Sequence, residues 1–392
     1  MEPASKIESI KIQGFRSLAD VELTDLPNAA VLIGPNGSGK SNIFLFLEML
    51  RQMLRYRRLG EFVARHGGAD DQLFGGSART PELAASLAIK ISQDRHTYSF
   101  TLGFAQSDKL EFNEESFSSR LVSGLSDVGW AYSGGGTESG IMSLERDGFL
   151  KDKDRSKVDD PVILATVTSR SDIRDFFGIL AFHQFHNTDF NSNIKKSWDV
   201  TDNVRLRADG GNLAAVLYRL EREDTKRYDY ICGLVNRILP TFDRFDLEES
   251  YGKVLLRWKA KGSDKTMGAH LTSDGSLRYF CLVTLLNLPE EMLPSVILLD
   301  EPELGLHPSA VGLVGAMIKR MSRHRQVIVA TQSPLMLNEF DLGEVYVFDL
   351  KDGRTRIHRP DEEWLVNWVE EYSTGEIWLT NLIGGRPWSD WP

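Results

Sequence analysis

The stretch Val31-Leu-Ile-Gly-Pro-Asn-Gly-Ser-Gly-Lys-Ser-Asn42 decides the fold of this chain. Its three leading apolar residues predict the end of a buried strand, and residues 34–41 match the pattern G-x-x-x-x-G-K-[ST] without a mismatch. Apolar side chains then recur at helical spacing from Ile43 to Leu50. A strand, a glycine loop and a helix are the context in which backbone N–H groups surround a phosphate. The alternative is a chance glycine turn before a helix.

The side chains of this loop predict contacts with a nucleotide and its metal ion. Lys40 is long enough to reach the outer phosphates, and Ser41 offers a hydroxyl ligand for Mg²⁺. We expect the nucleotide-binding residues of this loop to be Asn36, Gly37, Ser38, Gly39, Lys40, Ser41 and Asn42.

The composition of the 392 residues, 41% apolar and 26% charged, is typical of a soluble globular protein with one large or two ordinary domains. No segment approaches the roughly 18 apolar residues of a membrane span, and the N-terminus lacks the apolar core of a signal peptide. We therefore expect a cytoplasmic protein with no membrane contact. The net charge of −10 argues against an overall basic nucleic-acid binder but allows a local basic patch. Cys232 and Cys281 lie in apolar helical patterns, which favours core positions over a disulfide.

Several segments outside the loop have clear periodicity. Residues 7–23 predict two strands, which we group with residues 31–33 as antiparallel strands ahead of the phosphate loop. Residues 84–105 and 109–119 alternate apolar and polar and predict a meander of strands. Further predictions are an exposed charged loop at 151–160, helices at 161–180 and 214–239, and strands at 245–258.

Residues 51–69 are basic, with five arginines and a histidine. One interpretation is a solvated helix face; the other is a surface that meets the phosphates of a nucleotide or a nucleic acid.

Residues 295–302, Ser-Val-Ile-Leu-Leu-Asp-Glu-Pro, form the second chemical motif. Four aliphatic residues in a row indicate a strand that is buried on both faces. Two adjacent acids at the end of such a strand are costly to bury unless their carboxylates bind polar groups or a metal ion. Asp300 is suited to hold Mg²⁺ together with waters and substrate phosphates, and Glu301 to activate an attacking water as a general base. The alternative is a plain strand end before Pro302.

A second anion site is predicted just before this strand, at residues 273–276. Ser273 and its neighbours stand where an apolar helix begins, and serine caps with exposed amides favour anions there. Some 260 residues separate Lys40 from Asp300, which is unlike a small GTPase or a nucleotide kinase. One nucleotide has no need of two such sites unless the second belongs to a partner's nucleotide.

Together these motifs resemble the head of an ABC-type ATPase, in the branch shared by RecF-like and OLD-like ATPases and labelled AAA_21. The resemblance covers most of the chain. It rests on the phosphate loop and on S-D-G-S at 273–276, I-L-L-D-E-P-E at 297–303, L-H-P at 306–308, V-A-T-Q-S-P at 329–334, F-H-Q-F-H-N-T at 182–188 and R-A-D-G-G-N-L at 207–213.

The resemblance implies two copies facing each other head to tail, with two ATP molecules and their Mg²⁺ between them. In that arrangement Ser273 and Gly275 contact the partner's γ-phosphate, and the nucleotide-binding residues of this segment are Ser273, Asp274, Gly275 and Ser276. Lys40 and Ser41 hold phosphate and Mg²⁺, while Asp300 and Glu301 hold Mg²⁺ and activate water.

Two glutamines and a histidine have roles implied by the same resemblance. Gln332 stands where transporter-type heads carry a switch histidine; it cannot titrate but can bond the γ-phosphate or the water, which leaves Glu301 as the main base. Gln184 matches either the Mg²⁺-sensing glutamine of such heads or an ordinary strand-end glutamine. His307 either organises the loop at the dimer face or simply packs there.

Residues 356–392 form a tryptophan-rich tail that is too short for the Toprim nuclease domain of OLD-like nucleases. Either the tail is a closing helix packed on the head or it is a docking surface for a second protein. Its five tryptophans are Trp364, Trp368, Trp378, Trp388 and Trp391.

The fold class that we predict is α/β: a P-loop NTPase of ABC-ATPase type, with a two-lobed head that combines a mixed sheet and an antiparallel β meander. We expect the head at 1–355, with a first lobe at about 1–190, a meander insertion at about 80–150 and a second lobe at about 191–355. The leading hypothesis is a Mg²⁺-dependent ATPase, active as a homodimer or a higher oligomer, that controls a separately encoded effector such as a nuclease in bacterial anti-phage defence. The alternative is a DNA-binding repair or replication clamp in the RecF manner. A small-molecule kinase is disfavoured because Glu301 and the signature suit attack by water.

Overall fold

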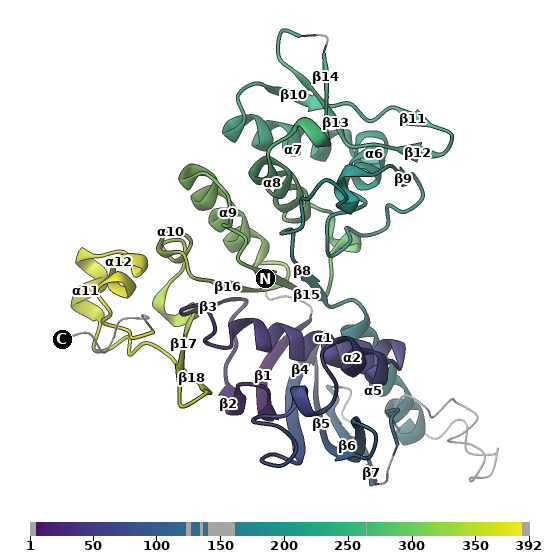
Figure 1. Ribbon diagram of the computed structural model, residues 1–392, viewed down its shortest axis with the longest axis vertical. Coiled ribbons are helices and arrows are strands. Elements are labelled where there is room, and N and C mark those ends of the chain that lie inside the picture. Colours follow the sequence, from purple (N-terminus) through teal and green to yellow (C-terminus); the bar gives the residue numbers. More distant parts are fainter. Residues whose placement is uncertain (1–4, 123–126, 134–135, 140–160, 264, 386–392) are drawn as a thin grey trace.

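The computed structural model describes residues 5–122, 127–133, 136–139, 161–263 and 265–385. Two six-stranded sheets lie one above the other, with helix α1 (Lys40–Tyr56) between them and a group of helices on the far side of the upper sheet (Figure 1). The expected α/β class with a mixed sheet and an antiparallel meander is confirmed.

The mixed sheet has the strand order β18-β17-β3-β16-β15-β8. Five strands run parallel and β18 pairs antiparallel with β17 at one edge. Alternate residues of the central strands enter two different cores, so both faces are buried, as the four-residue aliphatic run predicted. The strands are β3 (Ala29–Ile33), β8 (Ala181–His183), β15 (Val296–Asp300), β16 (Gln326–Thr331), β17 (Val345–Lys351) and β18 (Arg354–His358).

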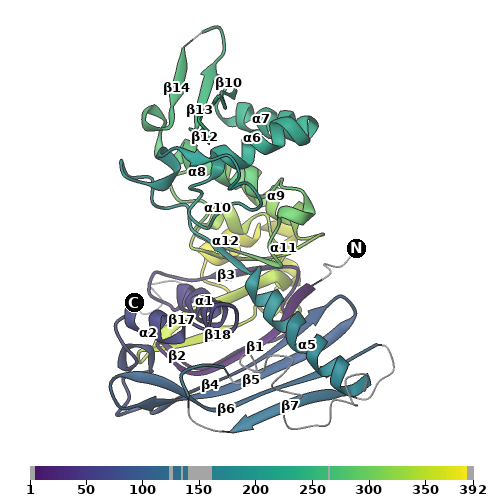
Figure 2. The same cartoon turned by 90° about the vertical axis from the view of Figure 1, so that its right-hand side faces the viewer.

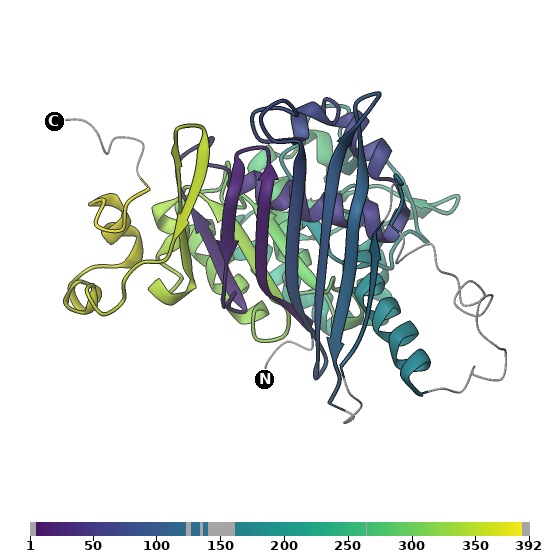
Figure 3. The ribbon, with the colours of Figure 1, turned by 90° about the horizontal axis from the view of Figure 1, so that it is seen from below.

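The second sheet is wholly antiparallel and contains the predicted meander (Figure 3). Its strands, in the order β2-β1-β4-β5-β6-β7, are β1 (Ser5–Phe15), β2 (Leu18–Leu23), β4 (Glu82–Ile91), β5 (Asp94–Ala105), β6 (Lys109–Arg120) and β7 (Val128–Ser133). The grouping of residues 31–33 with the first two strands was wrong. β3 pairs parallel with β16 and β17 instead, because its side chains must be buried on both faces.

Three helices lie on the side of the mixed sheet that faces the meander: α1, α2 (Leu59–Arg65) and α5 (Pro161–Gly178). Figure 2 shows α1 between the two sheets. Phe44, Phe46 and Leu47 of α1 are fully buried, and the core around them includes side chains from both sheets. The phosphate loop is therefore followed by a helix with apolar contacts above and below it, which fixes the direction in which its N-terminus points.

The other face of the mixed sheet carries a larger helical layer, shown in the upper part of Figure 1. Its helices are α6 (Leu213–Glu223), α7 (Thr225–Ile238), α8 (Asp274–Leu285), α9 (Pro308–Met321) and α10 (Pro334–Leu337). Two small sheets border it, made of β9 (Trp198–Asp199), β10 (Phe242–Phe245), β11 (Glu249–Ser250), β12 (Lys253–Val254), β13 (Arg257–Ala260) and β14 (Thr266–Gly268). Cys232 and Cys281 are buried and unpaired in this layer, as expected.

Four arginines of the basic stretch at residues 51–69 form ion pairs with neighbouring acids. The ion pairs are Arg51 with Glu48, Arg55 with Asp175, and Arg58 and Arg65 with Glu61. These contacts support a solvated helix face over a phosphate-binding surface. The predicted loop at 151–160 lies outside the described residues.

The tail is packed on the head in one part and exposed in another; its role as a docking surface stays a prediction. In α12 (Thr374–Leu379), Ile377 and Trp378 are buried in the core of the helical layer. In α11 (Val366–Glu371) no residue is buried, and Trp364 and Trp368 are 57% and 37% exposed. Trp388 and Trp391 lie outside the described residues. Among the described helices, none combines the length and the apolar character needed to cross a lipid bilayer.

A substitution at Leu298 tests whether β15 is a central strand that is buried on both faces. Leu298→Ala should lower the free energy of unfolding by about 2–5 kcal/mol, because the side chain is fully buried between α1 and the strands. Leu350→Ala is the matched control: that side chain is 45% exposed, and we expect a loss of under about 1 kcal/mol. Urea unfolding curves of the two variants provide the measurement. Equal losses would show that β15 is not a central strand.

Candidate nucleotide site

The predicted site residues outside 273–276 lie at one edge of the mixed sheet, where the parallel strands end. Asp300 at the end of β15 pairs with Ala330 of β16, and Thr331 pairs with Ile33 at the end of β3. On the other side β15 pairs with β8, whose last residue is opposite Leu299. The loops that follow these strands therefore lie side by side, at the edge where open α/β sheets bind ligands.

Lys40 is held inside the phosphate loop. Its ammonium donates hydrogen bonds to the carbonyl oxygens of Gly34, at 2.6 Å, and Pro35, at 2.9 Å, and the side chain is buried. Burial lowers the pKa of Lys40, and the carboxylates of Glu301 and Asp300 oppose this shift. The ammonium is thus a desolvated positive charge at the loop, and such a charge strongly favours an anion.

Ser41 and Asp300 are in direct contact. The Ser41 hydroxyl donates to Asp300 Oδ2 at 3.2 Å, although 259 residues separate the two in sequence. Burial raises the pKa of Asp300; Glu301 adds to the rise, while the Ser41 hydrogen bond opposes it. A hydroxyl and a desolvated carboxylate side by side are a donor set that suits Mg²⁺, which takes few protein ligands and keeps waters and phosphates. Among the described residues no group of three or more His, Cys, Asp and Glu forms a denser metal site.

Glu301 turns the chain away from the strand. Its φ of 43° lies in the left-handed region, and its backbone N–H donates to the Ala330 carbonyl at 2.8 Å. Left-handed backbone is uncommon outside glycine and is concentrated at functional sites. The turn leaves the side chain partly exposed next to Asp300, as a base acting on a bound water requires.

A second glutamate in this loop, Glu303, is a site residue that our sequence analysis missed. Its Oε1 accepts hydrogen bonds from the Thr331 hydroxyl at 2.5 Å and from the Gln332 N–H at 3.4 Å. Burial raises the pKa of Glu303. Glu303 thus ties the loop after β15 to the loop after β16 and fixes the backbone of Gln332. The signal was present in the sequence, since Glu303 is a third acid within four residues at the end of a buried strand.

The two predicted glutamines both lie at this edge. Gln184 follows β8 directly, is exposed, and donates its backbone N–H to the Ala208 carbonyl at 3.0 Å. Its neighbour His183 is buried, and burial lowers the pKa of the imidazole to about 4, so that ring is neutral at physiological pH. Gln332 is partly buried and held by Glu303. Their roles toward metal and water stay predictions.

Residues 274–276 begin α8, which belongs to the helical layer on the face of the mixed sheet opposite α1. In Figure 1, α8 lies above this sheet and α1 below it. Ser273 caps α8: its hydroxyl oxygen accepts from the Ser276 N–H at 3.2 Å. Gly275 packs on the loop after β15, where a Cβ would come within 2.3 Å of the Gly305 carbonyl oxygen. Within the described part of the chain, the side chains of residues 273–276 bond to one another and to Lys195, and Gly275 packs on the loop after β15; none of these contacts is with the phosphate loop.

Arg278, which the sequence did not single out, links the signature helix to the catalytic edge. Its guanidinium donates to the carbonyl oxygens of His186, in the loop after β8, and Leu304, in the loop after β15, both at 3.0 Å. His307 caps α9 at the end of the same loop, where its Nδ1 accepts from the Ser309 N–H. Position 278 gave no signal in sequence because an arginine on a helix is usually solvated.

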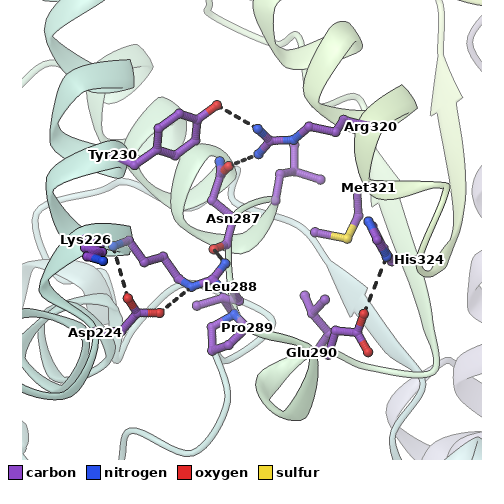
Figure 4. Close-up of a pocket in the computed structure, with 13 residues that line it drawn as sticks. Asp224, Lys226, Tyr230, Asn287, Leu288, Pro289, Glu290, Arg320, Met321 and His324 are labelled. Atoms are coloured by element: carbon purple, nitrogen blue, oxygen red, sulfur yellow. Dashed lines mark hydrogen bonds and ion pairs between the residues drawn. The ribbon is translucent and has the colours of Figure 1, made fainter.

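A second cleft lies between the ends of α7, α8 and α9, apart from this edge (Figure 4). Several of its polar groups are bonded to one another. Arg320 donates to the neutral Tyr230 hydroxyl at 2.6 Å, Arg227 pairs with Asp224 at 2.8 Å, and His324 lies 3.4 Å from Glu290. We assign this cleft no ligand.

A protein family model matches residues 29–338 of the chain, under the description "AAA domain, putative AbiEii toxin, Type IV TA system". The chain is also similar to the DNA replication and repair protein RecF of Anaeromyxobacter sp. strain Fw109-5, with 41% identity over 90 residues. RecF of Anaeromyxobacter dehalogenans strain 2CP-C matches with 38% identity over 97 residues. These segments are 22% and 24% of this chain and span only about a quarter of each RecF protein, 24% and 25%.

Two solved structures share the fold over nearly the whole chain. One is described as the SmcHead bound to the C-winged helix domain of ScpA: its TM-score is 0.56, its identity 15%, and the match covers 92% of this chain and 99% of that one. The other is an Smc head domain with an extended coiled coil, from Pyrococcus furiosus, bound to the C-terminal domain of ScpA. Its TM-score is 0.54, its identity 14%, and the match covers 94% and 99% of the two chains. The architecture is therefore that of an ABC-type ATPase head.

Asp300→Asn should raise the melting temperature of the ligand-free protein at neutral pH. The raised pKa means that the folded protein binds the Asp300 proton more tightly than the unfolded chain, so the charged carboxylate destabilises the fold. This penalty is full above the folded pKa and disappears as pH falls toward the unfolded value. The gain from the substitution should therefore shrink at mildly acidic pH, as measured by thermal unfolding. Asp229→Asn, at an exposed position of α7, is the control. A gain in melting temperature that does not depend on pH would contradict the raised pKa of Asp300 in the folded protein.

Proposed function

Because the chain belongs to the AAA_21 family, we propose that it is a Mg²⁺-dependent ATPase that works as a dimeric switch and controls a separately encoded effector in bacterial anti-phage defence. The observation that carries the ATPase is the hydrogen bond between Ser41 and Asp300 beside the buried ammonium of Lys40. These are the ligand groups that a nucleotide triphosphate with its metal requires.

The chemistry follows from the positions of these groups. Lys40 and the loop N–H groups would bind the phosphates, while Ser41 and Asp300 would hold Mg²⁺, which neutralises charge on the phosphate oxygens when it is bound. Glu301, turned out of the strand by its left-handed backbone, would take the proton of the attacking water. Gln332, fixed by Glu303, would orient that water or the γ-phosphate.

The dimer is supported by the exposed start of α8. This helix lies on the face of the mixed sheet opposite α1, and Ser273 and Asp274 are exposed. A second copy arranged head to tail would place this end of α8 against the first copy's γ-phosphate, where the helix N-terminus favours the anion. Gly275 is then needed because a larger residue would displace the loop that contains Glu301 and Gly305.

The control of an effector is supported by the family description and by the tail. The description names a toxin of a toxin–antitoxin system, which is a two-component arrangement. Helix α11 and its flanks expose Trp364 and Trp368 beside Glu362, Glu363, Glu370 and Glu371, all of them exposed. Exposed tryptophans with an acidic border suit a protein partner with a basic, partly apolar surface. We keep the division at about residue 355, between head and tail, as part of this proposal.

A DNA clamp is the second candidate, and the similarity to RecF favours it. The proteins that match are named for DNA replication and repair. The arginines that would line a DNA groove lie in residues 51–69. Four of them already form ion pairs with Glu48, Glu61 and Asp175, which argues against this candidate.

Glu301→Gln tests the assigned base and the dimer together. We expect kcat for ATP hydrolysis to fall by about 10²–10⁴-fold, because glutamine cannot accept the proton of the water. ATP and Mg²⁺ should then hold the variant as a dimer in size-exclusion chromatography with light scattering. Glu291→Gln, at an exposed position, should behave as wild type. Wild-type hydrolysis that does not slow on dilution, or a variant that stays monomeric with ATP, would contradict the composite site.

Electrophoretic mobility shift at graded salt separates the two candidates. We expect no shift of duplex DNA at physiological salt with ATP and Mg²⁺ present, because Arg51, Arg55, Arg58 and Arg65 are paired with acids. The double variant Arg55→Glu, Arg58→Glu should give the same result. Binding that falls steeply with salt, with a slope of about −0.9 per phosphate contact, and that the double variant loses would favour the DNA clamp.

A further inference from the structure

We propose that Thr355 is a positioning residue for the phosphate loop: together with Ser17 it holds the peptide between Ser38 and Gly39 in the orientation that binds phosphate. The inference rests on the proposed nucleotide binding. Thr355 is on β18, at the edge of the mixed sheet, and Ser17 is in the turn between β1 and β2 of the other sheet. Neither residue belongs to the phosphate-loop motif.

Four polar groups form a chain of hydrogen bonds under the loop. The Thr355 hydroxyl donates to the Ser38 carbonyl oxygen at 2.9 Å and lies 2.7 Å from the Ser17 hydroxyl. The Asn42 side-chain amide donates to the Ser17 hydroxyl oxygen at 2.8 Å. Since the Thr355 proton is used on Ser38, Ser17 must donate to Thr355 and accept from Asn42. Each hydroxyl in this order both donates once and accepts once, so the arrangement is fully specified.

The backbone reinforces the same contact. The Thr355 N–H donates to the Ser17 carbonyl at 2.8 Å, which joins β18 to the turn after β1. Thr355 is 3% exposed, so its hydroxyl has little access to water and depends on these partners. The contact is also close: a Cβ on Gly39, whose φ is 101°, would lie 2.0 Å from Thr355 Oγ1 and 2.8 Å from Ser17 Oγ. Gly39 is therefore the residue that lets the loop rest directly on the two hydroxyls.

The consequence for phosphate binding follows from the geometry of a trans peptide. The carbonyl of Ser38 and the N–H of Gly39 belong to one planar unit and point in opposite directions. When Thr355 holds the carbonyl, the N–H of Gly39 is directed to the other side. The same bond keeps the carbonyl oxygen, a partial negative charge, away from an incoming phosphate. The loop is thus preorganised, and less ordering is required when an anion binds.

The partners come from segments that are far apart in sequence. Thr355 is 317 residues from Ser38 and 338 from Ser17. The antiparallel sheet, the phosphate loop and the last strand of the mixed sheet therefore meet at this one point. We infer that the hairpin β17–β18 supports the nucleotide site in addition to closing the sheet.

Thr355→Val removes the hydroxyl and keeps the shape of the side chain. We expect the Kd for ATP with Mg²⁺, measured by isothermal titration calorimetry on the full chain, to rise about tenfold, because the Ser38 carbonyl and Ser17 lose a buried partner. KM should rise similarly and kcat should change less, since the same loop contacts act before and during the reaction. Thr355→Ser keeps the hydroxyl and should restore Kd to within about twofold of wild type.

Two controls separate positioning from plain stability. Thr284→Val also removes the hydroxyl of a buried threonine, but at the far end of α8, and should leave Kd unchanged. Ser17→Ala should weaken ATP binding in the same direction as Thr355→Val. If Thr355→Val fails to fold, Ser17→Ala provides the test in its place. The double variant should be less impaired than the product of the two single effects, because both remove one chain of bonds.

The outcomes distinguish this inference from the proposed function. If wild type does not bind ATP and Lys40→Ala makes no difference, the nucleotide site itself is wrong. If wild type binds ATP and Lys40→Ala abolishes binding, but Thr355→Val and Ser17→Ala both leave Kd within twofold, the positioning role is overturned. A thermal unfolding curve for each ligand-free variant shows whether a changed Kd accompanies an intact fold.

Discussion

The hydrogen bond between Ser41 and Asp300 is the contact on which the rest of this structure depends. It exists because β3 and β15 both flank β16 in one parallel sheet, in a register that brings their carboxyl ends level. That sheet is stable only when both faces are covered, which explains the two separate cores above and below it. The apolar packing thus fixes the relative positions of two polar groups that have little affinity for each other in water.

The site concentrates groups whose charged forms are costly to bury. Burial lowers the pKa of Lys40 and raises the pKa values of Asp300 and Glu303. All three shifts favour the uncharged form of the group, so the charged forms of these side chains destabilise the ligand-free fold. Metal and phosphate charges would satisfy such groups, and a site that is destabilising alone is expected where binding energy compensates.

The two faces of the mixed sheet carry different parts of the proposed site. The phosphate loop belongs to the face that packs on α1 and the meander, whereas the capped end of α8 belongs to the opposite layer. Arg278 of α8 donates hydrogen bonds to the loops after β8 and β15, at the edge where the parallel strands end. The loop after β15 is the one that contains Glu301, so the signature helix is bonded to that loop. Thr355 supports the loop from the edge of the same sheet.

The sequence by itself determined the motifs and the buried strands. The glycine loop, the four aliphatic residues before Asp300 and the alternation in the meander each express a local requirement, so a single stretch was enough to recognise them. The tertiary structure alone decided that β3 joins the parallel sheet, that α12 is buried while α11 is exposed, and that Glu303, Arg278 and Thr355 contact the site. These contacts join residues as many as 338 positions apart. Local periodicity contains no information about partners at that separation, because they are set by how the layers pack.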